Sequence, residues 1–550
     1  MWQRLALTAV LWAFVRADGN PTLTDTTLNV PVSATDGTKF DLHYYTNKQF
    51  AINGGPILVH LTFGDSADNV ANHQSLIYDI AKQLNATLVV VESRYYGKST
   101  WTITGNANDL AYYSDLNVDN ILADVKAVIT KVRTNNEKVY LSGAGYAGEL
   151  ATLFRLQNTD LISGAIISNA HLKLHQGGNV ALGALDKTLN TIYSTEKCDM
   201  TKLKAGFDAI ATITADNNKD AVDALKLNPD ITIISKFDEL RNYLHAAYYG
   251  LALQNFDMEH SYTIPGSDPP KVLKFGKRPL KTYCESIQNT GGDTLAKKLE
   301  PLSKLIEAYY QTSDTDSDGK HNIRANAQPI DRRELSLKCT TAPEYTCPQA
   351  DPNNYFPSVT KCEDDTTWIS LLRSDCEEKF SDFTAAKFTP DYMKTKTNNF
   401  NFKDLKNTIF IDSEYDPASV GRVTDISTDQ YGYLIPGANR FAHLHQPTSC
   451  DAENLKQVIN ILKCWNSGST TGNCDRSKLQ SKLTDYALQN SGTCSDQILA
   501  YPWGQDNTNP DQSTVAPVQS TTKSFASTTA VNLFTRLSLL SFVVFIFNGF

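Results

Sequence analysis

Short apolar segments alternate with segments of helical spacing in the first third of the chain. Apolar runs typical of buried strands cover residues 56–61, 86–91 and 138–142. Apolar side chains recur at helical intervals over residues 75–84 and 117–132. Such alternation is typical of a parallel sheet covered by helices. We therefore predict an α/β core whose first part spans residues 25–165.

The pattern changes between residues 166 and 395. Lys, Asp and Leu recur there at helical intervals, interrupted by loops that hold Pro and Cys, which indicates a mainly helical insertion domain. Beyond it, residues 408–412 and 432–436 have the pattern of strands, and residues 453–465 that of a closing helix. The last part of the α/β core is therefore expected over residues 396–500.

The N-terminal end has the pattern of a secretory signal peptide. A short basic start at residues 1–4 precedes an apolar run over residues 5–15, and the small residue Ala17 suits cleavage. We predict a signal peptide over residues 1–17. Because the apolar run is shorter than a membrane-spanning helix, an uncleaved anchor is the weaker alternative.

The C-terminal end has the pattern of a signal for a GPI anchor. Residues 505–530 are rich in Ser and Thr and predict a flexible stalk, and residues 531–550 form a hydrophobic tail. Small residues at 520–524 would be the attachment site. A transmembrane anchor is the alternative, weakened by Arg536 within the tail. Either version predicts a protein of the secretory pathway, extracellular or at the cell surface and bound to a membrane through this tail.

Composition and charge narrow the possible partners of the 550-residue chain. Hydrophobic residues make up 41% of it, enough to bury a core, and a net charge of −9 without basic blocks argues against nucleic acid. Ten cysteines in an exported chain predict several disulfides. We expect no cofactor and no metal, because no CxxC pair occurs and the acidic loop from Asp314 has Ala325 where a calcium loop needs glutamate. Asn85 opens an Asn-Ala-Thr glycosylation motif.

Residues 139–148 contain the strongest signal for chemistry. A strand that ends in small residues and passes at once into a helix is the geometry of a nucleophile elbow, in which a strained turn exposes the nucleophile of an α/β hydrolase. The small residues Gly143, Ala147 and Gly148 are present, but the residue at the tip of the turn is Gly145. The elbow is therefore predicted without its nucleophile.

Several motifs together resemble one family. They are Gly-Gly-Pro at 54–56, Glu-Ser-Arg-Tyr-Tyr-Gly-Lys-Ser at 92–99, Leu-Ala-Tyr at 110–112, Leu-Ala-Asp at 122–124 and the elbow at 143–148. In this order they resemble the family of lysosomal Pro-Xaa carboxypeptidase, dipeptidyl peptidase II and thymus-specific serine protease. The resemblance covers roughly residues 30–165 and 400–465. It implies an α/β-hydrolase fold with a helical insertion over the active site, and cleavage of peptides next to proline.

The resemblance also assigns the positions of the catalytic triad. The nucleophile of the family falls on Gly145, its acid on Asp416 and its histidine on Arg440, so only the acid is retained. Tyr146, the residue after the nucleophile position, is the candidate for the oxyanion hole. Glycine has no side-chain oxygen, and arginine, with a pKa above about 12, cannot act as a general base near neutrality. We therefore predict negligible hydrolysis by the usual route.

Two questions about this site stay open in the sequence. A rebuilt site could use Ser142 with His443 or His445, although a serine three positions upstream would sit within the strand. Asp416 and Arg440 could form an ion pair that keeps the buried acid satisfied, or Arg440 could point to solvent. The preferred hypothesis is an inactive relative that binds peptides or a protein ligand in the former cleft. An active exopeptidase with a rearranged site and a purely structural ectodomain are the alternatives.

Overall fold

The computed structural model describes residues 23–33, 37–67, 75–181, 183–256, 259–263, 272–311, 318–323, 331–341, 365–440, 444 and 449–479. All of them belong to one compact unit, residues 1–503. The predicted signal peptide, stalk and hydrophobic tail lie outside the described residues, as do His443, His445 and the start of the loop at Asp314. No helix within the described part of the chain is both long and apolar enough to cross a membrane.

The centre of the molecule is a mixed sheet in the order β1-β2-β4-β3-β5-β6-β9-β10. Its strands are β1 (Thr24–Pro31), β2 (Lys39–Asn47), β3 (Ile57–Leu61), β4 (Thr87–Val91), β5 (Val139–Ala144), β6 (Gly164–Ser168), β9 (Thr408–Tyr415) and β10 (Gln430–Asn439). The pairs β1–β2 and β2–β4 are antiparallel, and every later pair is parallel. This confirms the predicted α/β-hydrolase fold and the return of the sheet after residue 400.

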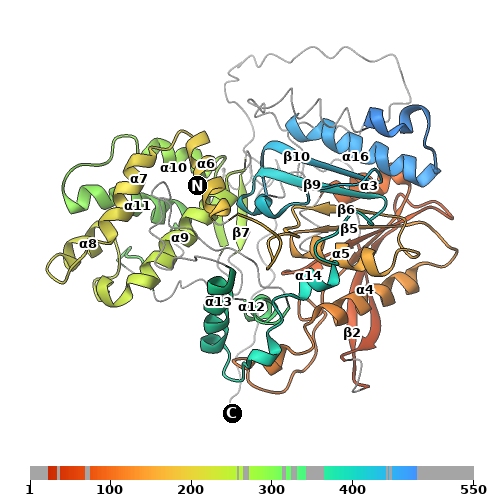
Figure 1. The fold of residues 1–550 in the computed structure, drawn as a ribbon, viewed down its shortest axis with the longest axis horizontal. Helices are drawn as coiled ribbons and strands as arrows, with labels where there is room; N and C mark the ends of the chain where they lie inside the picture. The colour runs from red at the N-terminus through yellow and green to blue at the C-terminus, as the bar shows by residue number, and fades with distance from the viewer. Residues whose placement is uncertain are drawn as a thin grey trace, which may run out of the picture. The chain divides into compact units, whose positions relative to one another are not determined.

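Helices cover both faces of this sheet (Figure 1). One face packs against α4 (Val118–Val132) and α5 (Tyr146–Gln157), and the other against α3 (Ser75–Leu84) and α16 (Ser449–Ser467). The central strands carry apolar, often β-branched side chains toward both layers, as β3 does with all of its residues buried. The predicted helices at 75–84, 117–132 and 453–465 are therefore confirmed as the covering layers.

The inserted helices form a separate hydrophobic core. They are α6 (Ala184–Thr195), α7 (Met200–Ile210), α8 (Asn218–Ala224), α9 (Phe237–Leu253), α10 (Pro279–Ser286) and α11 (Leu295–Tyr310), with the hairpin of β7 (His260–Thr263) and β8 (Val272–Phe275). Two stacked tyrosine pairs lie inside it, Tyr193 with Tyr248 and Tyr243 with Tyr310. Aromatic side chains therefore contribute much of the surface that this core buries.

Three further helices among the described residues precede β9 and pack differently. They are α12 (Arg332–Lys338), α13 (Asp365–Lys379) and α14 (Tyr392–Lys396). Their buried residues Leu335, Cys376 and Met393 belong to the core beneath α4 and α5, not to that of the inserted helices. The stretch expected as one insertion, residues 166–395, thus contains the last strand residues of β6, a separate helical body and helices that pack on the sheet core.

Disulfides close loops within these bodies. Cys198 pairs with Cys284, Cys339 with Cys376, and Cys464 with Cys474. The prediction of several disulfides is therefore confirmed for the described residues. The first bond joins the chain between α6 and α7 to α10, and the second ties α12 to α13.

Candidate active site

The elbow is built as the sequence predicts, at the carboxyl end of β5. Gly145 follows this strand and caps α5, with backbone angles φ 57° and ψ −130°, and its N–H donates to the carbonyl of Ser168 at 2.9 Å. A side chain on Gly143 would lie 2.4 Å from the carbonyl oxygen of Ala147, which explains the small residues beside the turn. The strand and the helix can approach this closely only because glycine stands there.

Glycine at the tip changes both the chemistry and the strain of this turn. A residue with a side chain would adopt the positive φ only at a cost of about 1 to 3 kcal/mol, which active enzymes sustain at such turns. Gly145 adopts it without that strain, but offers no oxygen or sulfur to attack a substrate. The elbow therefore keeps its geometry and lacks its reactive group.

Asp416 lies directly after β9 and is completely buried. It caps the 3₁₀ turn η4 (Pro417–Gly421), where its Oδ1 accepts the N–H of Ala418 at 3.1 Å. Its Oδ2 lies 3.1 Å from Nε2 of His171 and accepts from Nδ2 of Asn169 at 3.3 Å. Asp416, the acid expected from the sequence, is thus surrounded by hydrogen-bonding groups at the carboxyl edge of the sheet.

The structure also brings Arg440 to Asp416. Arg440 follows β10, its Nε lies 3.7 Å from Oδ2 of Asp416, and a quarter of its side chain is exposed. Burial raises the pKa of Asp416 most strongly, but Arg440 and His171 outweigh it and hold that pKa below its ordinary value. The carboxylate therefore stays charged.

His171 is the residue at this site that sequence reasoning missed. It lies three residues beyond the end of β6, is 2% exposed and makes a shorter contact with Asp416 than Arg440 does. No motif marks it, because its partner is 245 residues away along the chain. Its place after a parallel strand was the available signal, since the carboxyl ends of such strands meet at one edge.

A second carboxyl group completes this buried cluster. Asp412 lies on β9 four residues before Asp416, and its Oδ1 has no hydrogen-bond partner among the residues that the structure describes. Burial raises the pKa of Asp412 to about 7, with Asp416 adding to the shift and His171 opposing it. One acid of the cluster is thus ionised near neutrality, whereas the other is partly protonated there.

Tyr146 begins α5, so its N–H is one of the first four that find no acceptor within the helix. An N–H group at this place suits the role in the oxyanion hole that is expected for Tyr146, and this role stays a prediction. Its ring packs edge-on against Phe63, with ring centroids 4.6 Å apart, and Phe63 contacts Tyr96 in the same way at 5.0 Å. Aromatic rings thus lie beside the elbow.

Ser142 lies within β5, as expected, and has a histidine neighbour that the sequence did not indicate. Its Oγ is 3.1 Å from Nδ1 of His60 on the adjacent strand β3. The two side chains are almost completely buried, His60 with 1% and Ser142 with 3% exposed. The hydrogen bond is as short as one between a catalytic serine and its histidine. Both side chains, however, are packed between the sheet and its covering helices.

The segment at 92–99 supports the core beside the elbow. Arg94 is buried and binds both carboxylate oxygens of Asp124 through Nε and Nη2, at 2.7 and 2.8 Å. Glu92 accepts the N–H groups of Ala67, Lys98 and Ser99. These contacts give most of the polar residues of the motif a structural role. Charged side chains are tolerated in a protein interior when they are paired and hydrogen-bonded.

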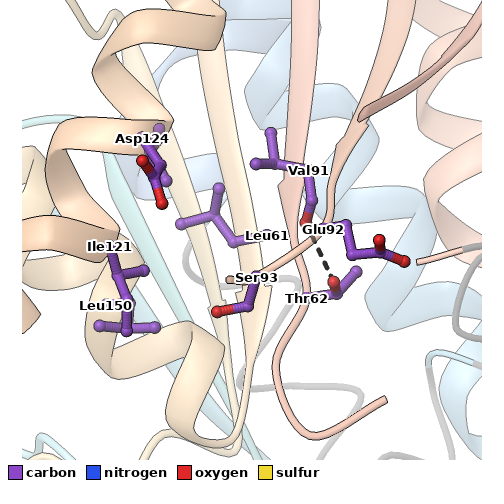
Figure 2. A pocket seen from close by; sticks show the side chains of 9 residues that line it. Leu61, Thr62, Val91, Glu92, Ser93, Ile121, Asp124 and Leu150 are labelled. Atoms are coloured by element: carbon purple, nitrogen blue, oxygen red, sulfur yellow. Dashed lines mark hydrogen bonds between the residues drawn. The ribbon is translucent and has the colours of Figure 1, made fainter. Parts of the chain in front are cut away.

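A cavity of about 10 Å³ lies between these groups and α4. Glu92, Ser93 and Asp124 are among the residues that line it, as Figure 2 shows. Such a volume is comparable with the space needed by one water molecule, so it cannot hold a peptide.

Asn85, the predicted glycosylation site, is exposed in the turn between α3 and β4, and its modification stays a prediction.

Comparisons with known proteins place this chain in a family. The profile described as Serine carboxypeptidase S28 matches residues 31–462. The chain belongs to this family. The S28 chain thus has the α/β-hydrolase fold of a serine peptidase, with the elbow at the carboxyl end of β5. The resemblance predicted from the motifs is confirmed.

Individual relatives of the S28 chain are distant. It is 24% identical over 477 residues to Prolyl carboxy peptidase like protein 5 of Caenorhabditis elegans, covering 79% of this chain and 88% of the relative. It is also 24% identical over 400 residues to Lysosomal Pro-X carboxypeptidase of Homo sapiens, covering 70% and 74%. Among solved structures, Proline iminopeptidase of Mycobacterium smegmatis matches 80% of this chain and 99% of its own, with 11% identity and a TM-score of 0.30.

Proposed function

We propose that this chain is a prolyl carboxypeptidase-like S28 protein that has lost peptidase activity and acts by binding a peptide or protein ligand. The observation that carries the proposal is Gly145, which occupies the nucleophile position of an intact elbow. Loss of the nucleophile alone costs on the order of a millionfold in turnover in a serine protease. The arginine at the histidine position supplies no base either.

The surroundings of Asp416 support the loss of catalysis. A triad needs its acid to orient a histidine that in turn contacts the nucleophile. Here the acid contacts His171, Asn169 and Arg440, and the first two side chains are almost completely buried. This arrangement suits the stability of a buried carboxylate. A fold kept intact around a lost nucleophile favours a binding role.

The proposal includes export and attachment to a membrane. The signal-peptide pattern at residues 1–17, the tail at 531–550 and the disulfides support passage through the secretory pathway. One named relative, the human Pro-X carboxypeptidase, is lysosomal by name, which agrees with such a route. We propose a location at the cell surface or outside the cell, with a lipid anchor preferred to a transmembrane helix.

A second candidate is an active hydrolase with a rearranged site. The hydrogen bond between Ser142 and His60 favours it, since a serine within 3.1 Å of a histidine is the minimal unit of an activated nucleophile. Burial argues against it, because a substrate carbonyl could not reach Ser142 without opening the layer between the sheet and its helices. It therefore ranks second.

Activity measurements on the purified protein separate the two candidates. The wild-type chain is incubated with proline-containing fluorogenic peptides from about pH 4 to pH 8 and with a fluorophosphonate that labels reactive serines. We expect neither turnover nor label. Turnover together with a label that Ser142→Ala abolishes would establish the rearranged site and refute the loss of activity.

Binding is tested on the same preparation. Short peptides that contain proline are titrated against the folded protein, with a Gly145→Trp variant to fill the space beside the elbow. Saturable binding that this variant weakens at least about tenfold would support the former cleft as the ligand site. Absence of binding over a broad peptide set would overturn that part of the proposal and favour a structural ectodomain.

A further inference from the structure

The segment of residues 169–178 connects the sheet to the inserted helices. It begins directly after β6 and leads toward α6, the first helix of the separate body. Its backbone is tied to the other side of the insertion, because the N–H of Asn169 donates to Ile411 at 2.7 Å and that of Lys173 to Gly421 at 2.8 Å. We call residues 169–178 the strap.

Two histidines of the strap are each paired with a buried carboxylate from a different element. His171 lies 3.1 Å from Asp416 at the end of β9, and His175 Nε2 lies 3.0 Å from Oε2 of Glu149 on α5. Both histidine side chains and both carboxylates are at most 3% exposed. The strap is thus fixed to the elbow helix at one histidine and to the acid of the former triad at the other.

The charges around the two histidines differ. His171 faces Asp416 and Asp412 from β9, and Arg440 from beyond β10 shares Asp416 with it. Arg422 also acts on Asp412. His175 faces Glu149 from the first turn of α5. A protonated histidine balances its carboxylate and makes a charge-assisted hydrogen bond, whereas a neutral one leaves a buried negative charge less compensated.

We propose that the strap, which leads into the inserted helices, is held to the sheet and to α5 in a pH-dependent way, most firmly when both of its histidines carry a proton. Its grip weakens as rising pH removes these protons. The mechanism is independent of whether the chain hydrolyses peptides, since neither pair needs a nucleophile. It gives the region beside the elbow a different local stability in acidic and in neutral compartments.

Hydrogen exchange of the full-length protein measures how firmly the strap is held, as the protection of its backbone amides. Exchange is followed at about pH 5 and about pH 8, each corrected for the intrinsic rate at that pH, and protection is compared between residues 169–178 and the central strand β5. We expect protection of the strap to fall at least about tenfold more than that of β5 between the two conditions. Equal changes in the strap and in β5 would overturn the proposal.

Variants assign the effect to the histidines. His175→Gln keeps a polar side chain but cannot take up a proton, so we expect low strap protection already at about pH 5 and little further loss at about pH 8. His43→Gln is the matched control, because His43 also pairs with a carboxylate, Asp25, but lies on β2. A His175→Gln strap with the wild-type pH profile refutes the assignment. If that variant does not fold, the wild-type comparison alone decides.

Discussion

Asp416 keeps its charge in the interior because three side chains surround it. Nε2 of His171, Nδ2 of Asn169 and Nε of Arg440 lie 3.1, 3.3 and 3.7 Å from its Oδ2. A buried carboxylate left without such partners would destabilise the fold by several kcal/mol. These partners are what keeps a buried carboxylate tolerable at this position. His171 makes a shorter contact with Asp416 than Arg440 does.

Removing His171 should cost more stability than removing Arg440. His171→Ala breaks a nearly fully buried pair, for which we expect a loss of about 3 kcal/mol in the free energy of unfolding. Arg440→Ala removes a longer contact from a side chain that is a quarter exposed, and about 1 kcal/mol is expected. Urea unfolding measures both. An Arg440→Ala loss as large as that of His171→Ala would show that the arginine is the principal partner.

Single residues show the limits of sequence reasoning. Gly145 could be placed because small motif residues fix the chain on both sides of it, Asp416 because the acid is retained although its neighbours differ from the family, and Arg440 because a recognisable strand precedes it and a helix follows. His171 and His60 could not, since each contacts a residue far away in the chain, at 245 and 82 positions. Such contacts are created by the order of the strands in the sheet, which no local pattern specifies.

At the scale of elements, the elbow is a close junction of a strand and a helix. A Cβ on Gly143 would meet the carbonyl of Ala147 at 2.4 Å, and one on Gly148 would meet backbone and side-chain atoms at 3.0 to 3.1 Å. The obstacles at Gly143 are backbone atoms, which cannot rotate away. The small residues of this motif are therefore required by packing even when no chemistry takes place at the tip.

Gly143→Ala should consequently destabilise the protein although no nucleophile is present. We expect a loss of about 3 kcal/mol or more, seen as a lower thermal midpoint, because β5 and α5 would have to separate. Gly276→Ala is the matched control, since a Cβ there meets no atom within 4 Å. A Gly143→Ala protein as stable as the control would mean that the elbow can relax.

The elements themselves were predictable where their patterns are regular. The strands at 57–61, 87–91 and 139–144 and the helix at 118–132 lie within one or two residues of their predicted positions, because buried parallel strands have continuous apolar runs. The packing of α12 and α14 on the sheet core was not predictable. Their sequences have the same helical spacing as the inserted helices, and spacing does not identify the surface that a helix covers.

At the scale of the whole molecule, buried acids make stability depend on pH. Burial raises the pKa of Asp79 to about 8 and that of Asp412 to about 7, both far above the value of an exposed aspartate. Asp79 lies on α3, and within the described part of the chain its Oδ2 has no hydrogen-bond partner. In the folded state these two acids therefore keep protons that they lose in the unfolded state between about pH 4 and their raised pKa values. Their contribution to the free energy of unfolding falls as pH rises through this range.

Asp79→Asn tests this dependence away from the strap and the elbow. Asparagine resembles the protonated acid but has no proton to lose, so the variant should be about 5 kcal/mol more stable than the wild type near pH 8 and nearly equal to it near pH 4. Asp208→Asn, at an exposed position of α7, is the matched control and should leave the pH profile unchanged. Urea unfolding at several pH values gives both profiles. Parallel profiles for Asp79→Asn and the wild type would contradict the raised pKa, because the two curves run parallel only when Asp79 has the same pKa in the folded and the unfolded protein.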